Sequence, residues 1–75
     1  MEVMTDRRPK VKDRIFYMLE EYTIQAIAAE EDSYVLTRLG DPGSKAFVLV
    51  AAELRWQESL HAWWPMGVRN FFEAD

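Results

Sequence analysis

His61 is the residue best suited to catalysis, because it is the only histidine in a chain without cysteine. A catalytic histidine needs a carboxylate to orient it, and Glu58 lies one helical turn before it. Ser59 is the nearest hydroxyl nucleophile, but on a helix its side chain would point away from His61. No local motif marks another nucleophile. The residues therefore predict that the protein is not an enzyme, with His61 on the surface or in a lid over the core.

Two other segments have residue types that bind ions in some proteins. The run Glu30-Glu31-Asp32 lacks the alternating ligand positions of a calcium loop. The segment Gly40-Asp41-Pro42-Gly43 has neither the lysine nor the following helix of a phosphate-binding loop. Both are typical of turns, so the sequence predicts no metal and no cofactor.

Size and composition predict one small globular domain. A chain of 75 residues has room for a single core and little for a deep catalytic cleft. Its 49% hydrophobic and 29% charged residues are typical of folded proteins. The lack of cysteine fits a reducing cytoplasm, and the sequence has neither a long apolar run nor a secretory signal at its start. We expect a cytoplasmic protein without a membrane segment.

Charge divides the chain into a basic start and an acidic remainder. Residues 15–75 carry four basic and ten acidic residues, a net charge of −6. We expect residues 1–9 to be a flexible basic arm and residues 10–75 a single small domain. The arm is either a solvated terminus or a contact for phosphate or an acidic partner, although the acidic body would repel nucleic acid. The basic candidates for such a contact are Arg7, Arg8, Lys10, Lys12 and Arg14.

The strongest local signal is a hairpin centred on Gly40-Asp41-Pro42-Gly43. Residues 33–39 and 45–50, on either side of this turn, are rich in β-branched and aromatic side chains and predict two strands. Residues 22–27 predict a further strand before the polar segment that starts at Glu30. Together these segments predict a three-stranded meander.

Residues 11–29 allow two interpretations. Their apolar residues also recur at helical spacing, which would give an α+β fold of helix, hairpin and helix. Several apolar residues lie off that helical stripe, and strands explain them more easily. We favour a first strand over residues 10–17 and a bend at Glu20-Glu21.

The predicted succession of strands resembles that of Src-homology-3-like small β-barrels of the KOW type. Lys12 stands where such barrels usually have a glycine before an aspartate. The resemblance implies a mainly β fold, a small antiparallel barrel or meander, whose surface serves as a docking site in transcription, translation or repair machinery. The segments that carry it are residues 10–15, 22–27, 34–39, 47–50 and 52–54.

Aromatic residues gather in the last twenty positions. Residues 57–64 predict a short C-terminal helix that Pro65 and Gly67 end, with Leu60, Trp63 and Trp64 on one face. This face would either close one end of the barrel or anchor a partner protein, because tryptophan dominates the energetics of many interfaces. The candidates for partner binding are Trp56, Trp63, Trp64, Phe71 and Phe72.

These features favour a non-enzymatic protein-interaction module that regulates a larger bacterial machine. Small size, acidity and a C-terminal aromatic cluster give the chain a profile that is similar to that of phage-encoded regulators of host RNA polymerase. RNA polymerase is therefore an expected partner. The alternative is a nucleic-acid-binding barrel in which the arm contacts phosphates while Tyr17, Tyr34 and Phe47 stack on bases.

Overall fold

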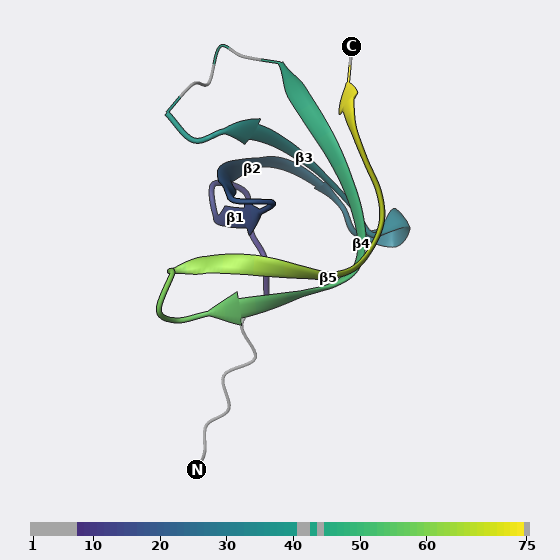
Figure 1. Ribbon diagram of the computed structural model, residues 1–75. Helices are drawn as coiled ribbons and strands as arrows, with labels where there is room; N and C mark the ends of the chain where they lie inside the picture. The colour runs from purple at the N-terminus through teal and green to yellow at the C-terminus, as the bar shows by residue number, and fades with distance from the viewer. Residues whose placement is uncertain (1–7, 41–42, 44, 75) are drawn as a thin grey trace.

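Five strands make up most of the part of the chain that the computed structural model describes, which is residues 8–40, 43 and 45–74. Each strand is antiparallel to the next. The last strand, β5, pairs in parallel with the first, β1, so that the sheet closes into a barrel (Figure 1). The predicted mainly β fold and small barrel are confirmed. The elements are β1 (Arg14–Tyr17), β2 (Glu20–Ala28), the 3-10 helix η1 (Ala29–Glu31), β3 (Ser33–Arg38), β4 (Ala46–Gln57) and β5 (Ala62–Ala74).

The core lies inside the barrel and follows the alternation of the strands. In β1, Ile15 is fully buried while Arg14 before it is exposed. In β5, Trp63 points inward while Trp64 faces solvent, because successive side chains of a strand lie on opposite faces. Burial of these apolar side chains is the main stabilising contribution in a domain this small. The buried cluster contains Ile15, Tyr22, Ile24, Leu36, Leu49, Ala51 and Trp63.

The long hairpin of β4 and β5 bends as it passes around the barrel (Figure 1). The bend coincides with a bulge in β5, because Val50 pairs with Asn70 whereas the next residue, Ala51, pairs with Val68. Gly67 lies beside the bulge with φ at +64°, and a Cβ atom there would lie 3.0 Å from Cβ of Ala52. Glycine at this position therefore permits both the backbone angle and the close approach of the two strands.

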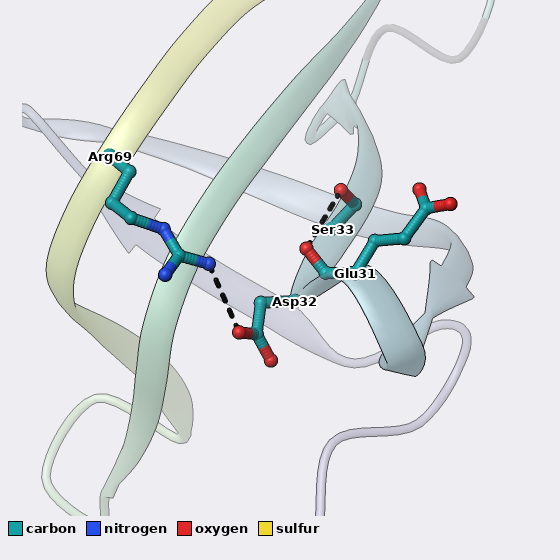
Figure 2. A network of polar contacts seen from close by, with 4 residues as sticks. All are labelled: Glu31, Asp32, Ser33 and Arg69. Carbon is teal, nitrogen blue, oxygen red and sulfur yellow. Dashed lines mark hydrogen bonds and ion pairs between the residues drawn. The ribbon is translucent and has the colours of Figure 1, made fainter.

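The extra residue of this bulge, Arg69, ties β5 to the end of η1. Its Nη2 donates a hydrogen bond to Oδ2 of Asp32 at 3.0 Å (Figure 2). Asp32 has a left-handed backbone (φ 54°) and its carbonyl accepts a hydrogen bond from the backbone N–H of Ala51. Beside it, the hydroxyl of Ser33 donates to the carbonyl oxygen of Glu31 (Figure 2). The polar segment expected after residue 29 thus connects η1 to both β4 and β5.

The first described residues include part of the predicted basic arm. Residues 1–7, and Arg7 with them, lie outside the described residues. The backbone N–H of Lys12 donates to the carbonyl of Ile24 at 2.8 Å, and Lys10 and Asp13 form a hydrogen-bonded turn. Lys12 and Arg14 are therefore part of the barrel wall. No helix within the described chain is long and apolar enough to cross a membrane.

The predicted C-terminal helix is wrong. Residues 57–64 form the end of β4, a turn and the start of β5, and Pro65 and Gly67 lie inside β5 rather than ending a helix. Cross-strand pairing wins over helical spacing here, because Trp56 pairs with Trp63 and their rings pack edge to face with centroids 5.3 Å apart. The predicted strands at residues 47–50 and 52–54 are one continuous strand, β4, and the fifth strand is the aromatic segment itself.

Candidate functional site

The seam where β1 meets β5 leaves an apolar groove on the surface. Within the described residues these two strands pair at one position, Ile15 with Trp63. Next to this pair, the end of β1, the β1–β2 turn and residues 64–65 of β5 enclose a space of about 240 Å³. We call it the turn groove, and it is lined by Phe16, Tyr17, Met18, Leu19, Trp64 and Pro65.

The β1–β2 turn combines backbone strain with exposed apolar side chains. Tyr17 pairs with Glu20, so Met18 and Leu19 alone form the turn. Both have positive φ angles, 52° and 67°, as a type I′ turn requires. Such turns favour Asn-Gly, because other residues lose about 1–3 kcal/mol in this conformation. Met18 is nevertheless 72% exposed and Leu19 is 89% exposed. Neither local backbone preference nor burial in the core explains these two residue types.

Trp64 forms the opposite wall of the turn groove. It follows the buried Trp63 and therefore projects outward, where it remains 44% exposed. Its ring contacts that of Phe16 on β1, with centroids 5.9 Å apart. Pro65, the next residue on β5, is buried and also lines the turn groove. The barrel thus fixes the position of Trp64 through strand pairing while leaving much of its indole free for a contact.

Acidic residues flank the turn groove on the β2 side. Leu19 also borders a shallow, more polar hollow that contains Glu20, Glu21 and Arg38. Glu20 is compensated by Arg38, whose Nε lies 2.9 Å from its Oε1. Glu21 lies directly across from Phe16 in the β1–β2 pair and has no ion pair in the described part of the chain. The edge of the turn groove therefore has a net negative charge.

A second surface feature brings basic residues together with an aromatic ring. This basic hollow has a volume of about 390 Å³. Within it, Oδ2 of Asp13 accepts hydrogen bonds from the backbone N–H of Lys10 and from Nε1 of Trp63, each at 3.0 Å. The indole Nε1 of Trp56 donates to Oε1 of Glu58 at 2.8 Å. The residues that line the basic hollow are Lys12, Asp13, Arg14, Trp56 and His61.

The aromatic residues expected to bind a partner do not form one surface. Trp63 is in the core, and Trp56 is half-buried against it. Phe71 packs inside the barrel, whereas Phe72 faces solvent in the part of β5 that pairs with Val48. Trp64 alone among these candidates lines the turn groove. Alternation along β5 therefore separates neighbours that the predicted helix would have placed on one face.

An aromatic cluster of Tyr17, Tyr22, Phe47 and Phe71 forms part of the packing of the core. The rings of Phe47 and Phe71 stack with centroids 5.5 Å apart, and the guanidinium of Arg38 lies 5.6 Å above Phe47. The candidates for stacking on bases, Tyr17, Tyr34 and Phe47, are all partly buried against the core, and the rings of Tyr17 and Phe47 contact Phe71.

Tyr22 in this cluster makes the stability of the fold sensitive to alkaline pH. Burial, reinforced by the nearby Glu20, disfavours its phenolate and raises the pKa of Tyr22 above the usual 10.0, although Arg38 acts in the opposite direction. The hydroxyl is neutral in both states well below pH 10. As the pH rises further, the unfolded chain ionises first and stability is lost.

We expect the melting temperature to fall as the pH rises from about 9 to 12, and to fall less steeply in Tyr22→Phe. Burial also raises the pKa of Tyr34, so the variant should reduce the fall without removing it. Circular dichroism melts across this range measure the effect. Identical pH profiles for wild type and variant would show that Tyr22 does not control it.

His61, which the sequence predicts to lie on the surface or in a lid, also has a definite place. His61 lies in the β4–β5 turn with φ at 50°, and its ring contacts that of Trp56 with centroids 6.2 Å apart. Among residues 8–40, 43 and 45–74, no three acidic or histidine side chains come close enough together to hold a metal ion. The geometry around His61 is that of a turn packed on an aromatic ring.

Comparison of the chain with protein-family models, curated proteins and solved structures found no match. The turn groove is therefore identified from its own geometry. Sequence reasoning missed Phe16, Met18 and Leu19 as site residues. The signal that could have revealed them is a pair of large apolar residues, Met18-Leu19, directly before the acidic pair Glu20-Glu21.

Proposed function

We propose that the chain is a non-enzymatic protein-binding module that docks through the turn groove. The observation that carries this proposal is the exposure of Met18 and Leu19 in a turn whose backbone disfavours them. Residues held in costly conformations are concentrated at functional sites, and exposed apolar clusters are typical of protein interfaces. Trp64 supports the proposal because tryptophan is enriched among the residues that contribute most to binding energy.

The module would regulate a larger bacterial machine in the cytoplasm. A small β-barrel is a common docking scaffold, and KOW-type barrels are the family whose strand succession the sequence resembles. The acidic, compact chain also has a profile similar to that of phage-encoded regulators of host RNA polymerase. Bacterial RNA polymerase is therefore the first partner to test, with a change in transcription as the expected consequence of binding.

The decisive experiment is capture of partners from nuclease-treated bacterial lysate, followed by binding to purified RNA polymerase. The wild type should retain a partner, and Leu19→Ser should retain at least about tenfold less, because it removes the most exposed apolar side chain of the groove. Leu60→Ser is the matched control, since Leu60 lies in the β4–β5 turn outside the turn groove. Equal capture by all three proteins would contradict docking through the turn groove.

A second candidate function, nucleic-acid binding, is favoured by the basic hollow. Lys12 and Arg14 supply cations beside the ring of Trp56, a combination that suits phosphate contacts and base stacking. Capture from the same lysate with and without nuclease treatment separates the two functions. Retention that disappears on nuclease treatment, and that depends on Lys12 and Arg14 rather than Leu19, would assign the chain to nucleic acid.

A further inference from the structure

We infer that the turn groove selects a basic amphipathic segment of its partner, with apolar side chains against Leu19 and Trp64 and a lysine or arginine beside Glu21. This inference rests on the protein-binding function proposed above and adds the chemistry of the partner.

Two of the acidic residues near the groove are already compensated. Oε1 of Glu20 lies 2.9 Å from Nε of Arg38, and Oε2 of Glu53 lies 3.1 Å from Nε of Arg55, the residue that pairs with Trp64 across β4 and β5. An incoming cation gains little from a carboxylate that already has a partner. These pairs therefore leave the charge of Glu21 as the unbalanced one on this side.

Glu21 is well placed to contact a segment that lies in the groove. It is directly across from Phe16, a groove residue, and its neighbour on β2, Glu20, follows Leu19 at the edge of the turn. Opposite charges aligned across an interface raise the association rate and select the partner. The net charge of −6 over residues 15–75 attracts the same kind of partner from a distance.

The sign of the surface charge changes between Arg14 on β1 and Glu21 on β2, and this change would orient the partner. Arg14 lies two residues before Phe16 on the same face of β1 and lines the basic hollow. A segment lying in the turn groove would therefore place its cation near Glu21 and avoid cations near Arg14. A segment with acidic flanks would meet Glu21 as a like charge, which costs binding energy.

The probe for this inference is a synthetic amphipathic helix built only from Leu and Lys. The control is a helix with the same apolar face in which Glu replaces Lys. At physiological ionic strength, fluorescence anisotropy should show the Leu/Lys helix binding the wild type at least about tenfold more tightly than the Leu/Glu helix. Leu19→Ser should weaken binding of the Leu/Lys helix by a similar factor.

Two variants with the same change in net charge test the role of Glu21. Glu21→Lys should weaken binding of the Leu/Lys helix about tenfold and strengthen that of the Leu/Glu helix. Glu30→Lys is the matched control, because Glu30 is exposed in η1, which Figure 1 shows on the far side of the barrel from the β1–β2 turn. It should change either affinity less than about twofold.

Several results would overturn the inference. One is equal binding of the two helices, and another is an equal effect of Glu21→Lys and Glu30→Lys. A third is Leu19-dependent binding to neutral phosphatidylcholine vesicles that is tighter than binding to the Leu/Lys helix. A dimer in sedimentation that Leu19→Ser dissociates would also do so, by assigning the groove to a second copy. If the two helices bind equally, or the two charge variants have equal effects, but lysate capture still depends on Leu19, the protein-binding function stands. Only the assignment of the partner's charge then fails.

Discussion

Trp63→Ala is expected to lower the free energy of unfolding by about 3–5 kcal/mol, which is comparable to the whole stability of a domain this small. The side chain is only 2% exposed, its ring packs on Trp56, and it occupies the one position where β1 and β5 pair in the described structure. Truncation would also leave Oδ2 of Asp13 without its indole donor. Urea denaturation followed by circular dichroism measures the loss.

The neighbouring variant Trp64→Ala is the matched control for this prediction. The Trp64 side chain is 44% exposed and contacts Phe16 on the outer face of the barrel. Its loss should change stability by less than about 1 kcal/mol while reducing capture of the partner. Similar stability losses in the two variants would contradict the assignment of one tryptophan to the core and the other to the docking surface.

The strands on either side of the expected turn at residues 40–43 were predicted well because their sequence signals are local. Residues 33–38 and 46–50 have the β-branched and aromatic composition of strands on both sides of a strong turn signal, and both are strands in the structure. Residues 11–29 do not form the alternative helix, because closure of the barrel buries Ile15, Tyr22 and Ile24 on one face of two paired strands. Local spacing allowed both arrangements, and long-range pairing decided between them.

The predicted C-terminal helix and the missed turn have a common physical cause. Residues 57–64 contain apolar residues at helical spacing, but pairing of Trp56 with Trp63 across β4 and β5 overrides that spacing. Met18-Leu19 does not resemble a turn, because its residue types are unfavourable at positive φ and hairpin turns are recognised by glycine and asparagine. Sequence rules assume that each residue type suits its local backbone conformation. They therefore miss a site whose residues are unfavourable in the conformation they adopt.

The candidate site was therefore predicted only in part. Trp64 was among the residues expected to bind a partner, as part of an aromatic group that the barrel divides between core and surface. Apart from Pro65, its neighbours in the turn groove come from β1 and the β1–β2 turn, more than forty positions earlier in the chain. Closure between Ile15 and Trp63 brings these segments together, and no local pattern specifies that closure.

Replacing the β1–β2 turn by Met18→Asn/Leu19→Gly is expected to stabilise the fold and to abolish docking. Asn-Gly suits a type I′ turn, so relief of the two positive φ angles should raise the free energy of unfolding by about 1–2 kcal/mol, reduced somewhat by the extra freedom of glycine in the unfolded chain. Capture of the partner should fall at least about tenfold, because the two most exposed apolar side chains of the groove are lost.

Met18→Ala/Leu19→Ala separates the two effects in the same turn. Alanine removes the apolar side chains but keeps the unfavourable φ angles of residues 18 and 19, so capture should fall as in the Asn-Gly variant while stability does not rise. Thermal melts and capture measured on the same preparations provide the comparison. A less stable Asn-Gly variant would mean that Met18 and Leu19 support the barrel itself, whereas undiminished capture by both variants would show that the partner binds elsewhere. Opposite changes in stability and binding are the result expected of a turn whose residues serve a contact rather than the fold.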